Sequence, residues 1–316
     1  MQRPRHHHPR GARSLARRLS LGSAAVLLLG GCSVKQFAIK QVGSALASGA
    51  GGAFAAESDP EFAGQAVPFS LKLIESLLWE QPDNAELLLA AAAGFTQYAF
   101  VWVQQPADFI EAEDFAAAQH DRIRARNFYL RAHDYALRAL EVRHPGIAEK
   151  LRTDPEAAVA KLARVDVPAM YWAAASLGSA ISLGKTEPAL VSRQNEFAAL
   201  LDRAAALDIE WSGGLLRELL MAYAPARPGA GAAGVARARE LFAEIIARSD
   251  GTSAGPYVSF AESICVQEQD RAEFVRLLER ALAIDPATTP QNRLANVVMQ
   301  QRARWLLDRV DELFLE

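Results

Sequence analysis

Cysteine is nearly absent from this 316-residue chain, which has only Cys32 and Cys265. We expect Cys32 to be used for a modification described below, so no pair remains for a disulfide within the mature chain. Cys265 lies in an apolar helical pattern, and a free cysteine in such a pattern is expected to be a small buried side chain. The fold must therefore be held by packing without covalent cross-links.

Two kinds of apolar pattern are also missing. Alternating runs of Val, Ile and Thr, which would mark strands, do not occur. The apolar run from Leu19 to Leu29 has about 11 residues, whereas a helix that spans a bilayer needs roughly 20. The sequence therefore indicates neither a sheet nor a membrane-spanning helix.

Catalytic and metal-binding motifs are absent as well. The chain contains no G-x-S-x-G, H-E-x-x-H, phosphate-binding loop or paired C-x-x-C. His120 and His133 are each followed by Asp, and neighbours on a helix point apart, so we expect solvated helix-face residues. Glu111, Glu113 and Asp114 are interpreted as a charged loop or a partner contact. We expect no enzyme activity, no cofactor and no metal.

The N-terminal residues explain the apolar run. Six arginines and no acidic residue precede or enter it, which is typical of a secretory signal peptide. The following Leu29-Gly30-Gly31-Cys32 resembles the bacterial lipobox. We expect removal of residues 1–31 and acylation of Cys32, with an ordinary signal peptide and a chance cysteine as the alternative. Ser33 favours delivery to the outer membrane, and Arg17-Arg18 leaves the Sec and twin-arginine export routes open.

Removal of residues 1–31 leaves 28 basic against 37 acidic residues, a formal charge of −9. A mildly acidic chain is a poor ligand for nucleic acid. Residues 32–58 are rich in Gly, Ala and Ser, and we expect them to tether the body to the lipid anchor.

Residues 59–316 are predicted to form one all-α domain. Five helices share apolar spacing i, i+4, i+7, i+8 and end at a Pro or Gly turn, with copies starting near Ser70, Ala132, Ala198, Ala238 and Phe274. We interpret them as the second helices of degenerate tetratricopeptide-like pairs in a curved α-solenoid. Candidate first helices cover 85–103, 168–183, 213–223 and 256–268, and inserts are expected at 104–124, 143–166 and 225–234. Recurrent Pro and Gly disfavour the alternative, a coiled coil.

Aromatic residues recur on three of the expected first helices. They are Phe95, Tyr98 and Trp102; Tyr171 and Trp172; and Tyr257 and Phe260. First helices line the concave face of such a superhelix, so these side chains are candidates for the wall of an apolar cavity or a partner-binding surface. Simple core packing is the alternative. The last helix, 293–315, is expected to cap the final pair, with Arg302, Arg304 and Arg309 as surface charges.

Several longer segments resemble one protein family. They are GFTQYAFVWVQQPADFIEAED (94–114), ARNFYLRAHDYALRALE (125–141), DVPAMYWAAASLGSAISL (166–183), AGPYVSFAESICVQEQDRAEFVRLLERAL (254–282) and NRLANVVMQQRARWLLDRVDELF (292–314). In this order they resemble the TatT family, lipoproteins associated with tripartite ATP-independent periplasmic (TRAP) transporters. The 225–234 linker is the one departure.

The resemblance implies a homotrimer with hydrophobic cavities and a pore, placed at the periplasmic side of a membrane. It also implies association with the transporter's periplasmic substrate-binding subunit and help in the uptake of a small organic ligand, with hydrophobic compounds among the candidates. The alternative function is a tetratricopeptide-like scaffold lipoprotein in envelope assembly, without a small ligand.

Overall fold

The structure, a computed structural model, describes residues 52–315. The expected signal peptide, Cys32 and most of the expected tether lie outside the described residues. Every regular element between residues 52 and 315 is helical, and this part of the chain contains no strand. The predicted all-α class is thereby confirmed.

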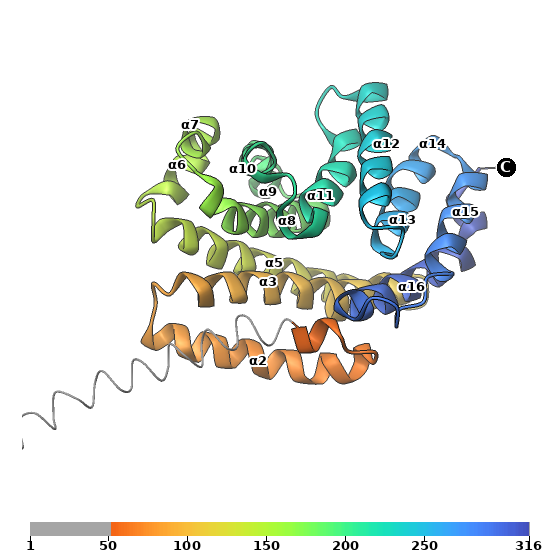
Figure 1. Cartoon of the computed structure of the whole chain (residues 1–316), viewed down its shortest axis with the longest axis horizontal. Coiled ribbons are helices and arrows are strands. Elements are labelled where there is room, and N and C mark those ends of the chain that lie inside the picture. Colours follow the sequence, from red (N-terminus) through yellow and green to blue (C-terminus); the bar gives the residue numbers. More distant parts are fainter. Residues whose placement is uncertain (1–51, 316) are drawn as a thin grey trace, which may run out of the picture.

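The N-terminal half is a stack of long helices (Figure 1). In it α2 spans Pro60–Glu80, α3 Ala85–Ala99, α5 Phe115–Glu141 and α8 Val167–Leu183. Asp59, Asn84 and Asp114 cap α2, α3 and α5, because each side-chain oxygen accepts a hydrogen bond from a free amide of the first turn. Helix α3 packs on α2 with one face and on α5 with the other, and α5 packs in turn on α8.

The remaining elements are shorter, and several join end to end. Their bounds are η1 Phe100–Gln104, α4 Gln105–Ile110, α6 Ile147–Thr153, α7 Pro155–Val159, η2 Arg164–Asp166, α9 Pro188–Val191, α10 Gln194–Asp208, η3 Trp211–Gly214, α11 Leu215–Tyr223, η4 Ala224–Ala226, α12 Gly231–Arg248, α13 Gly255–Phe260, η5 Ala261–Cys265, α14 Val266–Glu268, α15 Arg271–Leu282, η6 Pro290–Asn292, α16 Arg293–Asp308 and α17 Val310–Leu313.

The five expected second helices correspond to α2, α5, α10, α12 and α15. The segments expected as inserts hold more helix than the sequence suggested. Residues 104–124 continue the first helix through α4 to Ile110 and then begin α5, while 143–166 contain α6, α7 and η2. In 225–234 the helix α12 already starts at Gly231. Gly234 is buried there, and a Cβ on it would lie 2.4 Å from the carbonyl oxygen of Ala224, so the close approach of α12 to η4 requires a glycine.

The continuous helix from Ala85 to Ile110 is, among the described residues, the one helix long and apolar enough to cross a membrane by length and composition. Its apolar character has a simpler cause in this fold. Leu87, Leu88, Ala91 and Ala92 are fully buried because α3 lies between α2 and α5 and also touches α8. A helix buried on opposite sides is apolar around most of its circumference.

Helix α16 returns to the N-terminal half of the chain (Figure 1). It packs on α15 and α13, and it also meets α4: the side-chain amide of Gln105 donates to the carbonyl of Val298 at 3.3 Å, and the rings of Phe109 and Trp305 lie 5.3 Å apart. Arg293 further donates to the carbonyl of Ala56. The last helix therefore does more than cap the final pair, because it fastens the C-terminal half to the beginning of the fold.

Candidate functional site

The aromatic residues of α3 and η1 pack toward two different neighbours. Phe95 is 2% exposed, and its ring stacks with those of Phe128 and Tyr135 from α5 at about 6 Å. Tyr98 and Trp102 are half-buried. The indole nitrogen of Trp102 donates to the carbonyl of Pro60 at 2.7 Å and lies over Gly64, so Trp102 joins η1 to the start of α2.

The second aromatic group lies where α8 meets α11. Tyr171 contacts both Trp172 and Trp211, with ring centroids 4.9 Å apart in each pair. Tyr171 is buried, whereas Trp172 and Trp211 keep part of their surface open. Glu218, in the first turns of α11, keeps part of its surface open, but its carboxyl group is enclosed and has no hydrogen-bond or ion-pair partner within residues 52–315. Burial raises the pKa of Glu218 to about 7. The pKa of Tyr171 is also raised, mainly by its own burial and further by the negative charge of Glu218.

The third aromatic group belongs to the C-terminal half. Phe260 is fully buried and packs against Phe242 at 4.5 Å, and Tyr257, 6% exposed, meets the same ring edge-on at 5.7 Å. Cys265 is fully buried in the same core, as the sequence predicted. Burial raises the pKa of its thiol to about 12, which keeps the sulfur in its unreactive protonated form.

The structure does not bring all seven candidate residues together. Phe95 and Tyr171 belong to one hydrophobic cluster, with Tyr98, Trp102 and Trp172 packed against its edge, whereas Tyr257 and Phe260 belong to a second cluster. The three with surface left open within one chain are Tyr98, Trp102 and Trp172. That these seven residues line a cavity stays a prediction.

His133 corrects one expectation. The sequence indicated a solvated helix-face histidine, but its side chain is completely buried. Its Nδ1 donates to the carbonyl of Ala173 at 2.9 Å, and its Nε2 lies 3.2 Å from Oε1 of Glu196 and 2.6 Å from Nη2 of Arg193. The expectation failed because His133 lies on the stripe of α5 that also buries Tyr129, Ala132 and Ala136, whereas its neighbour Asp134 lies on the exposed stripe of the same helix.

A second buried polar group lies where α4, α5, η5 and α16 meet. Arg302, expected on the surface, is 8% exposed and donates to both Asp108 and Glu262. Asp108 also accepts from Arg122 at 2.8 Å, and Arg122 pairs with Glu111. Glu111 therefore lies in the charged turn between α4 and α5, and its ion pair with Arg122 joins this turn to the buried group.

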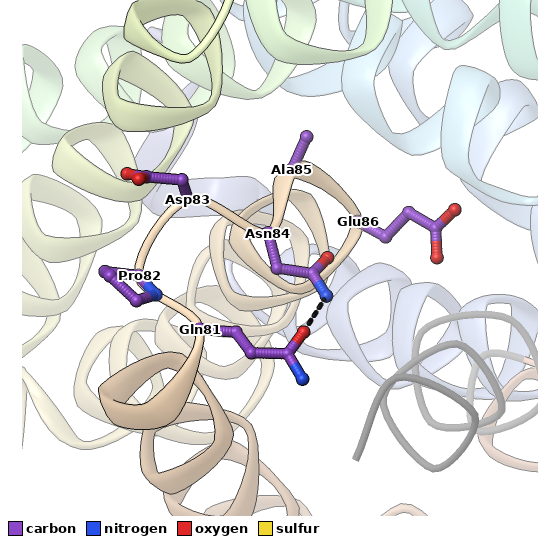
Figure 2. A pocket seen from close by; sticks show the side chains of 6 residues that line it. All are labelled: Gln81, Pro82, Asp83, Asn84, Ala85 and Glu86. Carbon is purple, nitrogen blue, oxygen red and sulfur yellow. Dashed lines mark hydrogen bonds between the residues drawn. The ribbon is translucent and has the colours of Figure 1, made fainter. Parts of the chain in front are cut away.

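Two hollows of the described surface are shallow and lie away from the three aromatic groups. Figure 2 shows the first, at the turn from α2 to α3, where the side-chain amide of Asn84 donates to that of Gln81 at 2.9 Å. The second is lined by Lys72, Glu75, Ser76 and Trp79 on the outer side of α2. No group of three or more metal-ligating side chains occurs within the described residues.

Sequence reasoning missed Trp211, Glu218 and the His133–Arg193–Glu196 group. One signal was present for His133, which continues the buried spacing Tyr129, His133, Leu137 along α5. Another was present for Glu218, a lone acid inside the apolar stretch LLRELLMAY. The partners of His133 come from segments 40 to 63 residues away, which no local pattern shows.

Comparison with known proteins gives a consistent result. Residues 56–314 match the family model described as the TRAP transporter T-component, which covers nearly all of the described fold. A protein of Treponema pallidum (strain Nichols), named only as an uncharacterized protein, is 30% identical over 310 residues. That alignment covers 93% of this chain and 96% of the relative.

Proposed function

Because the chain belongs to the TRAP transporter T-component family, we propose that it is a lipid-anchored accessory protein of such a transporter in the periplasm. It binds the periplasmic substrate-binding subunit and takes part in delivering a small organic ligand, of hydrophobic character. The observation that carries this proposal is the family match over residues 56–314.

Several structural features support an accessory role without chemistry. Cys265 is buried with a raised thiol pKa, and His133 is enclosed by hydrogen-bonding neighbours, so neither is placed to attack a substrate. The part-open rings of Tyr98, Trp102 and Trp172 offer apolar contact surface. The half-buried Glu218 beside Tyr171 adds a titratable group to the α8–α11 surface.

The assembly and the anchor are further parts of the proposal. Cys32 carries the acyl chains, residues 32–58 tether the helical body, and the mature protein forms a homotrimer at the outer membrane. A Cys32→Ala variant is expected to leave the membrane fraction after cell fractionation. Light scattering on the protein lacking the anchor is expected to give the mass of three chains.

Co-purification from the native bacterium tests the functional proposal. The tagged chain is cross-linked lightly in intact cells and isolated from the envelope. The proposal expects the substrate-binding subunit of a TRAP transporter among the most enriched proteins, in amounts that fall when the cross-linker is omitted. Enrichment of envelope-assembly proteins in its place would support the scaffold alternative.

A further inference from the structure

Helix α2 carries an unusual set of exposed aromatic side chains. Phe62 is 62% exposed, Phe69 73% and Trp79 87%. Within residues 52–315 no other helix exposes three large hydrophobic side chains. Scattered exposed apolar residues need no explanation, but several on one face of one element mark a contact surface.

Phe62 and Phe69 lie on one stripe of the outward face of α2, and Trp79 lies to the side of that stripe. Phe62, Ala66, Phe69 and Leu73 follow one another at i, i+4, i+7 and i+11, which places them in one stripe. The buried stripe that packs on α3 is different, and consists of Ala63, Val67, Leu71, Ile74 and Leu78. In Figure 1 α2 forms the lower edge of the molecule, so its outward face is covered by no other described element.

The width of this apolar face indicates which kind of partner covers it. A partner helix needs a narrow apolar seam, but Trp79 lies well to the side of the stripe, next to Lys72 and Glu75. The C-terminal continuation of the stripe is polar, at Ser76 and Glu80, and Pro68 interrupts the helix interior. A broad aromatic face on a helix with polar flanks is what a bilayer interface accepts, with Trp and Phe at the level of the headgroups.

The position of α2 along the chain supports the same occupant. It is the first long helix after the tether, and 27 residues separate Cys32 from Pro60. The chain from Cys32 to Ala56, whose carbonyl is held by Arg293, reaches at most about 85 Å. An anchor in the bilayer at Cys32 therefore keeps α2 at a high effective concentration next to the membrane surface.

We propose that α2 lies on the surface of the membrane that holds the lipid anchor, with Phe62, Phe69 and Trp79 inserted between the lipid headgroups. This inference rests on the anchoring at Cys32 proposed above. The exposed charges of α2 are mostly acidic, since Glu61 and Glu80 are exposed and the one exposed basic residue, Lys72, pairs with Glu75. Apolar insertion therefore drives the contact, and the contact does not depend on anionic lipid. When α2 lies on the membrane, the opposite side of the molecule, which carries α6, α7 and α12 in Figure 1, faces the periplasm.

Tryptophan fluorescence on the complete lipidated protein tests the contact. The protein is reconstituted into phosphatidylethanolamine–phosphatidylglycerol vesicles whose acyl chains carry bromine, which quenches nearby indoles. Of the five tryptophans, Trp79 alone is fully exposed, so we expect it to supply most of the quenching. Trp79→Phe keeps the apolar face and is expected to remove at least half of the quenched signal, whereas the matched control Trp305→Phe leaves that signal intact.

A second variant tests the docking while Trp79 stays in place as the fluorescent reporter. Phe62→Ser combined with Phe69→Ser, at exposed positions, is expected to keep the helical circular dichroism and to lose at least half of the Trp79 quenching. Equal quenching in wild type and Trp79→Phe overturns the inference. So does efficient disulfide cross-linking of Phe69→Cys to a second copy or to the substrate-binding subunit, since either would then occupy this face.

Mass spectrometry of the N-terminal peptide distinguishes the two levels of the proposal. An unacylated Cys32 overturns the anchoring itself, together with the docking that rests on it. An acylated Cys32 without quenching of Trp79 overturns the docking alone and leaves the anchor in place.

Discussion

At the scale of single residues, Glu196 shows how a charge is kept in the core. Its side chain is 2% exposed, and burial by itself would raise its pKa. Hydrogen bonds with His133 and Arg193, with their charges, outweigh burial and lower the pKa to about 2. The carboxylate thus stays ionised down to strongly acidic pH, and it joins α5 to α10.

This predicts an acid-dependent loss of stability. The pKa of Glu196 is lower in the folded than in the unfolded chain, so its contribution is complete above pH 4.5 and is lost as the pH falls toward 2. Glu196→Gln is expected to cost roughly 2–3 kcal/mol at pH 7 and to flatten the stability profile below pH 4.5. Urea unfolding at several pH values measures both. Glu240→Gln, at an exposed ion pair with Arg237, is the control and should change stability by less than about 1 kcal/mol.

Glu218 is expected to act in the opposite direction. Its folded pKa of about 7 lies above the unfolded value of 4.5, so the folded chain binds the extra proton and stability falls as the pH rises between these values. Glu218→Gln is expected to be about 1–2 kcal/mol more stable than wild type at pH 8, a figure reduced for its partial exposure, and equal to wild type at pH 4. Thermal unfolding at the two pH values checks this, and an equal difference at both would contradict the assigned titration.

At the scale of elements, the first helices separate two roles for their aromatic residues. Phe260 is fully buried, so Phe260→Ala is expected to cost about 3–5 kcal/mol, close to the loss from Leu278→Ala at another fully buried position. Trp172 is only half-buried, so Trp172→Ala should cost clearly less and should weaken binding of ligand or of the substrate-binding subunit. Unfolding midpoints and binding titrations of the three variants test this. A loss for Trp172→Ala as large as that for Leu278→Ala, with binding unchanged, would make Trp172 a core residue.

The sequence predicted the helical elements well because their signals are local. Apolar spacing and Pro or Gly turns located α2, α5, α10, α12 and α15, and Asp and Asn caps mark the starts of several. The extension of α3 to Ile110 was missed, since polar residues near Gln104 and Gln105 suggested a loop. In the structure these amides are used inside the fold: Gln104 accepts from the hydroxyl of Tyr129, and Gln105 donates to Val298.

The candidate site was harder to predict for a physical reason. Aromatic residues on a first helix have the same spacing whether they line a cavity or fill a core, and only tertiary contacts such as Phe260 on Phe242 distinguish the two. Buried polar groups are equally invisible. Arg302 and His133 look like surface residues because their partners, Asp108 and Glu196, are distant in sequence.

At the scale of the whole molecule, Arg302 connects the last long helix to the first half of the chain. Arg302→Ala is expected to cost about 1.5–3 kcal/mol, because Asp108 and Glu262 lose their shared partner, while Asp108 keeps its ion pair with Arg122 and Glu262 is partly exposed. Proteolysis should also become faster near α16. Arg271→Ala, in an exposed pair with Asp311, is the matched control and should cost less than about 1 kcal/mol. Similar losses in the two variants would show that the Arg302 contacts do not hold the halves together.

The central claim is a direct interaction with the substrate-binding subunit of a TRAP transporter. It is tested by sedimentation velocity on the two purified proteins mixed at about 100 µM each, where a complex with a dissociation constant of about 1 µM is nearly saturated. The account predicts a new species heavier than either protein alone, in which both absorb. Independent sedimentation of the two proteins, with and without the transporter's substrate, would contradict it.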